Sequence, residues 1–490
     1  MSLSKQGRTA DEIREDLATR HDQDLPTHGG RTWAYVYDSG VEELTSLLND
    51  ALVSYSSVNM LDPTVFPSIV DLEKSVVGAG LGLLGGGPDG VESAVGVVTS
   101  GGTESCVLSV KAARDYQDPN RTYKTKPNIV VAESVHPAFR KGAHYFSLDV
   151  ITVPVDPVTF RPEPGDFAKA INSDTVMVVV SAPSYAHGVV DPVAEVAQIA
   201  EAVGVLCQVD SCIGGWLLPY WRASGEPIPA FDFTIPGVTS ISVDLHKYAY
   251  TSKGVSLLLF RDDAVRRSCY FASASWPGYY FVNSTMQSTK SAGPLAAAWA
   301  GLQYLGDDGY AELAAQTLDA TKQIASGIAA IPGLRVLGDT DSALVAFTVD
   351  ETDVAADNLD IYVVADELRQ LGWYVQPQPR AGDLPSNIHL TVTAASLPNV
   401  DKLLADVPIA LEAAREHGPA VPPKELLDFA HDLRPEALTP DMLEGLLSIA
   451  GFNPSGASDA RQAIVNHLLD ELPLGTRETL LKHFLSYIYS

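Results

Sequence analysis

A lysine near the middle of the chain has neighbours that suit nucleophilic chemistry. Lys247 follows an apolar run in the stretch SVDLHKY (242–248), beside His246 and aromatic residues. Burial lowers the pKa of a lysine, and a neutral amine can condense with an aldehyde to form a Schiff base. A lone buried lysine is more often an ion-pair partner, so the other polar groups must decide between these two interpretations.

A pair of glycines earlier in the chain could bind an anion. Gly101 and Gly102 lie in VVTSGGTES (97–105), between an apolar run and a helix-like segment. Two glycines allow a tight turn whose N–H groups point at one anion, and a helix start adds favourable potential. Thr103 adds a hydroxyl donor, and no lysine follows as in a Walker motif, so a monophosphate group fits better than a nucleoside triphosphate. The alternative is an ordinary turn that begins a helix.

Two further side chains complete a set that suits one ligand. Asp210 ends the apolar run VLCQVD (205–210), where ligands collect in open α/β sheets, although such an aspartate can also cap a turn. His136 supplies an aromatic imidazole. In chain order, the turn, the imidazole, the carboxylate and the lysine suit pyridoxal 5′-phosphate. Its phosphate would lie on the glycine turn, its ring against His136, its ring nitrogen beside Asp210 and its aldehyde on Lys247.

Another set of glycines has the spacing of a dinucleotide fingerprint without its context. Gly80, Gly82 and Gly85 match G-x-G-x-x-G, which in a nicotinamide-binding protein follows a strand and begins a helix. Here a helix-like run (69–80) comes first, so we expect a helix end and a turn. A nicotinamide-binding oxidoreductase is therefore a distant alternative.

The elements that must position these residues form a regular pattern. Short β-branched runs alternate with mostly helical segments, and several runs are almost continuously apolar, which predicts a mainly parallel sheet buried on both faces in an α/β fold. The last run is expected to be antiparallel, because few residues separate it from the one before. The seven runs are 95–98, 128–132, 149–155, 175–182, 205–210, 240–244 and 255–260.

The pattern divides the chain into four parts. We expect an N-terminal helical and dimerisation segment, a large cofactor-binding α/β domain, a smaller α+β domain, and a helical C-terminal extension in which we find no chemistry. A proline-rich stretch separates the last two. The boundaries are 1–90, 91–330, 331–417 and 424–490.

The composition excludes several kinds of partner. There are 33 Lys and Arg against 61 Asp and Glu, a formal charge of −28, and so negative a surface repels nucleic acid and anionic lipid. No run approaches the ~20 apolar residues of a membrane span, and the N-terminal stretch contains no apolar signal region. The four cysteines form no C-x-x-C pair, and no histidine stands near Asp210 in sequence, so we expect a reducing cytoplasm and no metal site.

The motifs of the chain resemble those of a known enzyme family. They are similar to those of pyridoxal-phosphate enzymes of fold type I, the aspartate aminotransferase fold, and above all to sphingosine-1-phosphate lyases and their bacterial relatives. The SGGTE and HK motifs are shared with group II amino-acid decarboxylases, whereas the longest segment is more specific. The matching segments are NMLDPTVFPSI (59–69), VTSGGTES (98–105), SVHPAF (134–139), SAPSYAHGVVDPV (181–193), VDSCIGGWLLP (209–219) and FDFTIPGVTSISVDLHKYAYTSKG (231–254).

The resemblance implies roles for the matched residues. Tyr185 is a candidate for proton transfer, with simple packing as an equally good alternative. Residues implied to contact the substrate, across the interface of a homodimer with shared active sites, are Tyr37, Asn59 and Lys253. Residues implied to hold the cofactor are Gly101, Gly102, Thr103, His136, Asp210, His246 and Lys247.

Two departures from the lyase pattern bear on the substrate. Asp62 stands where the lyases have a histidine that helps to bind the substrate phosphate, so attraction becomes repulsion. Lys290 stands where an arginine is typical, and a lysine is a poorer bidentate clamp. We therefore expect a smaller amine, with a cationic or hydroxyl end facing Asp62, in place of a long-chain phosphorylated amino alcohol.

The expected reaction is cleavage of the Cα–Cβ bond of a β-hydroxy amine, with release of an aldehyde. The alternative is decarboxylation of an amino acid, because the same pocket parts serve both reactions. The two lyase-like segments, 181–193 and 231–254, favour aldehyde release.

Overall fold

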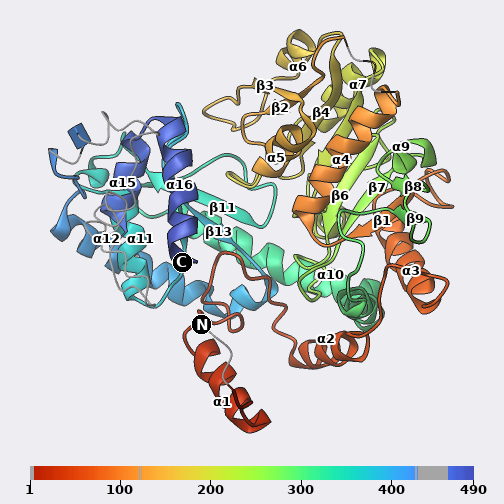
Figure 1. The fold of residues 1–490 in the computed structure, drawn as a ribbon. Helices are drawn as coiled ribbons and strands as arrows, with labels where there is room; N and C mark the ends of the chain where they lie inside the picture. Colours follow the sequence, from red (N-terminus) through yellow and green to blue (C-terminus); the bar gives the residue numbers. More distant parts are fainter. Residues whose placement is uncertain (1–4, 121, 123, 425–426, 429–461, 490) are drawn as a thin grey trace.

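The computed structural model describes residues 5–120, 122, 124–424, 427–428 and 462–489 (Figure 1). A large sheet domain and a smaller sheet domain lie side by side and are linked by a long helix, α10 (Gly293–Ala329). This helix changes direction at Gly306, whose φ of 56° favours glycine.

The large domain contains all seven predicted strands. The strand order is β1-β7-β6-β5-β4-β2-β3, and every neighbouring pair from β6 to β3 is parallel, whereas β7 is antiparallel to both β1 and β6. The predicted reversal of the last strand is thus confirmed, because the segment between β6 and β7 is too short for a crossover helix. The strands are β1 (Val95–Thr99), β2 (Asn128–Ala132), β3 (Asp149–Val153), β4 (Thr175–Ser181), β5 (Leu206–Asp210), β6 (Ser240–Asp244) and β7 (Ser256–Phe260).

Helices cover both faces of this sheet, which explains the continuous apolar runs. In β4, Val178 and Val180 pack in the core on one face, whereas Met177 and Val179 pack in the core on the other. Helices α4, α5 and α9 lie on the second face, and α3, α7 and α10 lie on the first. The helices around the sheet are α3 (Ser68–Leu83), α4 (Gly102–Gln117), α5 (Pro137–Phe146), α6 (Pro164–Ala170), α7 (Val193–Ala202), α8 (Leu218–Ala223) and α9 (Asp263–Ser268).

The small domain is an antiparallel sheet with helices. Its strands β10 (Leu334–Val336), β11 (Leu344–Val349), β12 (Gln376–Gln378) and β13 (Asn387–Thr391) have the order β10-β11-β13-β12. Helices α11 (Ile361–Gln370) and α12 (Val400–His417) pack against each other. Three short 3-10 helices complete the two domains: η1 (Gly214–Trp216), η2 (Val354–Ala356) and η3 (Ala394–Asn399).

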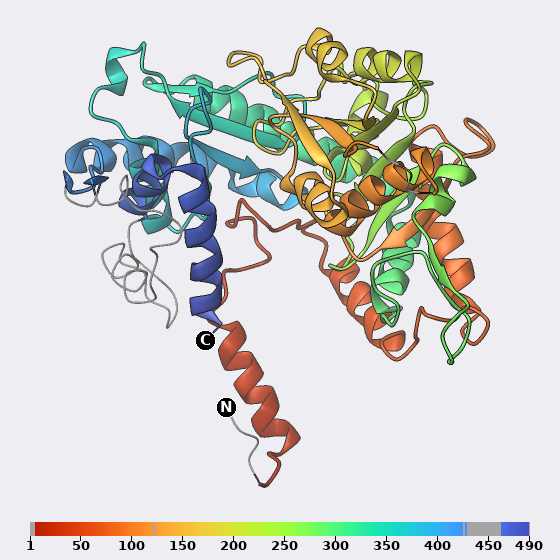
Figure 2. The ribbon, with the colours of Figure 1, turned by 45° about the horizontal axis from the view of Figure 1, so that its top comes forward.

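The two ends of the chain lie outside these sheets. Helix α1 (Ala10–His21) buries none of its residues and projects from the molecule (Figure 2), and α2 (Glu42–Ser54) packs on α10. At the C-terminal end, α15 (Ala463–Glu471) packs on α11 and is followed by α16 (Leu474–Ile488). The rest of the predicted helical extension, residues 425–426, 429–461 and 490, lies outside the described residues.

Three further observations complete the description of the fold. Among the residues placed in the structure, no helix is both long and apolar enough to cross a membrane. A two-stranded hairpin, β8 (Phe271–Ser273) and β9 (Phe281–Asn283), was not expected from the sequence, because its short strands show no alternation. The glycines at 80 and 82 lie within α3 and Gly85 follows it, as predicted for a helix end.

Candidate active site

A cavity of about 580 Å³ lies at the carboxyl ends of β4, β5 and β6, where Gln376 of the small domain also reaches. It brings together most of the residues singled out in the sequence. Asn59 and Asp62 do not line it in their own chain. The predicted residues that line it are Tyr37, Gly101, Gly102, Thr103, His136, Tyr185, Asp210, His246, Lys247 and Lys253.

The parallel strands explain why residues distant in sequence meet here. Ser181 at the end of β4 is in register with Asp210 at the end of β5, and Asp210 is in register with Ser242 on β6. Asp244 then ends β6 and lines the same cavity. Carboxyl ends of neighbouring parallel strands share one edge of a sheet, which is where ligands bind in open α/β folds.

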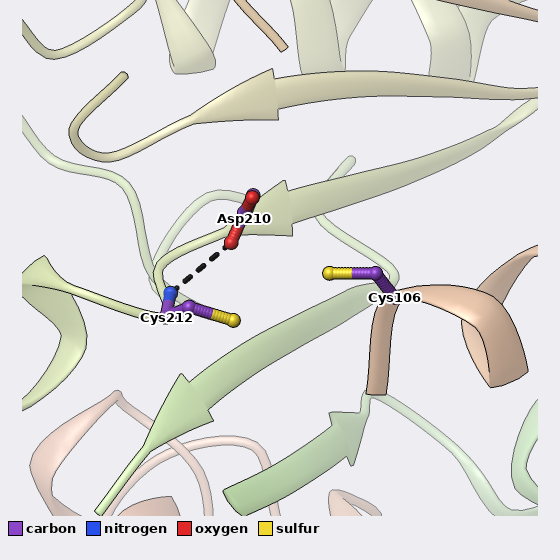
Figure 3. Close-up of side chains that lie close together, drawn as sticks. All are labelled: Cys106, Asp210 and Cys212. Carbon is purple, nitrogen blue, oxygen red and sulfur yellow. Dashed lines mark hydrogen bonds between the residues drawn. The ribbon is translucent and has the colours of Figure 1, made fainter. Parts of the chain in front are cut away.

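The carboxylate of Asp210 is buried and held on one side. Its Oδ1 accepts hydrogen bonds from the backbone N–H of Cys212 at 3.2 Å and from the hydroxyl of Ser242 at 3.4 Å (Figure 3 draws the first). Both bonds reach the same oxygen, so Oδ2 is left to face a cationic group in the cavity. This geometry suits the predicted contact with a protonated ring nitrogen.

The amine of Lys247 forms an ion pair, the alternative interpretation of a buried lysine, with a partner that was not predicted from the sequence. Its Nζ lies 2.9 Å from Oδ2 of Asp244, and 20% of the lysine side chain is exposed. Burial lowers the pKa of Lys247, as expected, but Asp244, Tyr37 and Cys212 together outweigh burial, with Asp244 contributing most, and the net pKa is raised well above the usual value. In the protein without its ligand the lysine is therefore a member of an ion pair, and its amine must lose a proton before it can condense with an aldehyde.

The glycine turn has the geometry of an anion cradle. Helix α4 begins there, and its N-cap residue, Gly101, has no side chain to cap the first N–H groups. At Gly102 a Cβ atom would lie 2.6 Å from Oδ2 of Asp244, so only glycine lets the backbone approach this carboxylate. Glu104 fixes the turn from inside, since its carboxylate accepts the N–H of Ser100 at 2.6 Å and that of Met286 at 2.7 Å.

Two histidines stand on the cavity wall. His136 precedes α5 and its Nδ1 accepts the N–H of Ala138 at 3.2 Å, which fixes the ring. His246 lies 2.8 Å, through Nδ1, from the carbonyl oxygen of Val255, so Nδ1 carries the hydrogen. Burial lowers the pKa of His246.

Tyr185 reaches the cavity from the loop after β4. Its ring stacks on His389 with 4.4 Å between ring centroids, and its hydroxyl donates to Oε1 of Gln376 at 3.0 Å. Burial lowers the pKa of His389 to about 3, so this imidazole is neutral, and burial raises the pKa of Tyr185. Tyr185 is thus both packed and oriented toward the cavity.

The predicted substrate-binding residues fall into two groups. Tyr37 and Lys253 lie together in the cavity, with the lysine Nζ 5.0 Å from the centre of the tyrosine ring. Asp62 is exposed and accepts both hydrogen bonds from Thr64, at 2.8 and 2.6 Å. The segment of Asn59 to Asp62 runs beside Lys290, whose carbonyl oxygen accepts a backbone N–H from this segment at 2.9 Å. The two departures from the lyase pattern are therefore on adjacent segments.

Three potential metal ligands also meet at the cavity wall. Ligand atoms of Cys106, Asp210 and Cys212 all lie within 4.8 Å of one another (Figure 3), a proximity that the sequence spacing does not reveal. Burial raises the pKa of Cys106, and contact with Cys106 together with burial raises that of Cys212. Protonated thiols are poor metal ligands, and Asp210 is the group best placed for a ring nitrogen.

Comparison with known proteins identifies the family. The family model described as "Pyridoxal-dependent decarboxylase conserved domain" matches residues 3–350. The chain belongs to this family. A second model, for a C-terminal HTH domain of pyridoxal-dependent enzymes, matches residues 424–487.

Similar relatives of this pyridoxal-dependent family are lyases. Sphingosine-1-phosphate lyase of Dictyostelium discoideum is 36% identical over 78% of this chain and 69% of its own length. Sphingosine-1-phosphate lyase 1 of Rattus norvegicus is 34% identical over 80% of this chain and 66% of its own.

Solved structures of a lyase and of a decarboxylase share the fold of this chain. A sphingosine-1-phosphate lyase of Burkholderia pseudomallei has a TM-score of 0.79 and 34% identity, covering 85% of this chain and 93% of that one. A glutamate decarboxylase of Lactobacillus brevis, at 22% identity and a TM-score of 0.72 over 85% of this chain and 96% of that one, shares the fold. The protein is thus a pyridoxal-phosphate-dependent lyase of fold type I, as the motifs predicted.

The residues present fit pyridoxal 5′-phosphate. The uncapped start of α4 can take its phosphate, Oδ2 of Asp210 its ring nitrogen, His136 its ring face and Lys247 its aldehyde. One oxygen of Asp244, Oδ1, is buried without a hydrogen-bond partner among the described residues. A carboxylate left partly unsatisfied beside Lys247 is consistent with a cavity made for a polar ligand.

Three functional neighbours escaped the sequence analysis. Asp244 stands three residues before Lys247, a spacing that could have suggested the ion pair. Glu104 follows the glycine turn directly and had a helix-start signal. Gln376 comes from β12 of the small domain, and no local signal connects it with Tyr185.

Proposed function

We propose that the protein cleaves the Cα–Cβ bond of a small β-hydroxy amine or amino-acid derivative and releases an aldehyde. The observation that supports this most is the contrast in similarity. A lyase structure is 34% identical to this chain, whereas a decarboxylase structure that covers as much of it is 22% identical.

Each cavity residue has a distinct task in this proposal. Bound pyridoxal phosphate supplies a ring that accepts the electrons released when a bond at the substrate Cα breaks. Asp210 stabilises positive charge on the ring nitrogen, and His136 limits the movement of the ring. Lys247 holds the cofactor and is placed to return a proton to Cα. Tyr185, oriented by Gln376, is the candidate for proton transfer with the β-hydroxyl group.

We place the far end of the substrate near Tyr37, Lys253 and a carboxylate from a second copy of the chain. Asp62 and Asn59 lie outside the cavity of their own chain, so they can complete a site only in a homodimer. Hydrogen bonds with Thr64 lower the pKa of Asp62, so it is charged and repels a phosphate. A cationic or hydroxyl end is therefore favoured over the phosphate that the lyase relatives' name implies.

Two unpartnered surfaces support this dimer. Helix α1 buries no residue, and the β8–β9 hairpin exposes Trp276, Tyr279 and Tyr280. Aromatic side chains are enriched at protein interfaces.

The four cysteines are all free and buried, which fits a reducing cytoplasm.

Decarboxylation is the second candidate, because the matching family model describes decarboxylases. The two reactions differ in their products. The purified enzyme with pyridoxal phosphate should release an aldehyde from β-hydroxy amines and no carbon dioxide from amino acids. If the enzyme releases carbon dioxide from an amino acid and no aldehyde from β-hydroxy amines, the proposed aldehyde-releasing activity is wrong and decarboxylation is the activity.

A further inference from the structure

A chain of four polar side chains runs through the interior between β5 and β6 and ends at Asp210. Register pairs Gln208 with Ser240 and Asp210 with Ser242, so all four point to the face covered by α4. Their exposures are 4% for Ser240, 0% for Gln208, 0% for Ser242 and 7% for Asp210. Polar groups this deeply buried destabilise a fold unless each finds a partner, so their hydrogen bonds are closely determined.

The amide of Gln208 is satisfied in one orientation. Its Oε1 accepts the hydroxyl of Ser240 at 2.5 Å, and its Nε2 donates to the carbonyl of Val209 at 2.9 Å and to Oγ of Ser242 at 3.2 Å. In the flipped orientation two oxygens would face each other at Val209 without a hydrogen. The network therefore assigns the amide direction.

The direction of the amide determines the direction of the next bond. Because Oγ of Ser242 accepts from Gln208, its single hydrogen is free to point at Oδ1 of Asp210, 3.4 Å away. The N–H of Cys212 donates to the same oxygen. Oδ1 is therefore an acceptor of two hydrogen bonds, which requires that it carry no proton and leaves Oδ2 toward the cavity. A bond of 3.4 Å is long, as hydrogen bonds in an active site without its ligand often are.

We infer that Gln208 and Ser242 are positioning residues, which hold the carboxyl group of Asp210 so that Oδ2 faces the ring nitrogen of pyridoxal phosphate and stabilises its protonated form. The inference rests on the proposed contact between Asp210 and that nitrogen. Ser240 stands at the far end of the chain and fixes the amide of Gln208. Each residue acts through the next, and none of the three reaches the reacting atoms.

Two forms of the cofactor separate positioning from simple packing. The apoprotein is titrated with pyridoxal 5′-phosphate and with 1-deazapyridoxal 5′-phosphate, in which CH replaces the ring nitrogen. Ser242→Ala should weaken binding of the natural cofactor about tenfold, the usual effect of one hydrogen bond to a charged group. Binding of the deaza form should change by less than about twofold, because its ring has no protonated nitrogen to interact with Asp210.

Further variants keep the test decisive if one of them folds poorly. Gln208→Met, which preserves volume, should reduce affinity for the natural cofactor in the same selective way, and Ser242→Thr should restore it. Thr321→Val is the matched control, because its buried hydroxyl donates to the carbonyl of Thr317 at 2.7 Å outside the cavity. It should leave both affinities unchanged.

The outcomes distinguish the two levels of the inference. Equal losses for both cofactor forms, or no loss in Ser242→Ala and Gln208→Met, would overturn the positioning role. If Asp210→Ala also fails to discriminate between the two forms, the assignment of Asp210 itself is wrong. If Asp210→Ala binds the two cofactor forms with different losses of affinity but Ser242→Ala and Gln208→Met do not, only the positioning role is wrong.

Discussion

The side-chain nitrogen of Lys247 lies 2.9 Å from Oδ2 of Asp244, and that carboxylate is buried beside the glycine turn. One carboxylate thus borders two parts of the site, the amine that binds an aldehyde and the turn that can bind a phosphate. The pair also determines how the empty protein should respond to pH.

Asp244→Asn should shift the pH dependence of cofactor uptake. Burial lowers the pKa of Lys247, but Asp244 and its neighbours together raise it by more than burial lowers it. The amine must therefore lose a proton before it can react, and uptake should become faster as pH rises. Without the carboxylate burial prevails, and the rise should move to lower pH by about one unit or more. Stopped-flow absorbance with apoprotein and pyridoxal phosphate measures this. Identical profiles for the two proteins would contradict the role of the pair.

Gly102→Ala should impair cofactor binding selectively. Its Cβ would lie 2.6 Å from Asp244, so either the turn or the carboxylate must move. We expect at least about a tenfold loss of cofactor affinity in equilibrium titration, from displaced charged hydrogen bonds. The control is Gly82→Ala in α3, where no atom lies within 4 Å, and where alanine should stabilise the fold by about 0.5–1 kcal/mol without changing affinity. Equal cofactor affinities for the two variants would contradict the role of the glycine turn in cofactor binding.

Tyr185→Phe should reduce kcat while KM and cofactor affinity stay unchanged. The phenylalanine ring keeps the stack on His389, and only the hydroxyl bonded to Gln376 is lost. Loss of a proton-transfer group typically lowers the rate about 10²–10⁴-fold. Tyr220→Phe is the control, since that tyrosine donates to Asp307 at 3.1 Å outside the cavity. An unchanged kcat would leave Tyr185 with a packing role only.

Asp62→His should change substrate preference toward phosphorylated amines. Replacing a charged carboxylate with an imidazole removes repulsion, so the ratio of kcat/KM for phosphorylated over unphosphorylated β-hydroxy amines should rise about tenfold. Asp89→His, another exposed acid, serves as the control and should leave the ratio unchanged. Efficient cleavage of sphingosine-1-phosphate by the unaltered enzyme would contradict the proposed substrate.

The sequence contained enough to predict the large sheet and most of the cavity. Val178 and its neighbours are apolar without alternation because both faces are covered. Asp210 ends one strand and Lys247 follows the next, and the ends of these strands meet at the cavity. Such features depend on local pattern and on the topology of parallel strands.

The remaining features depend on distances that the sequence does not encode locally. The raised pKa of Lys247 depends on its contact with Asp244 and the other groups around it, and the orientation of Tyr185 depends on Gln376 of the small domain. Likewise, Cys106 reaches Asp210 only because α4 packs over the end of β5.

The most direct test is reductive trapping of the bound cofactor. Holoenzyme is treated with borohydride and digested, and the modified peptide is located by mass spectrometry, with Lys247→Ala as the control. We predict that the added mass lies on Lys247 and that the variant retains none. An adduct on another lysine, or no adduct in the unaltered enzyme, would contradict the assignment of the active site.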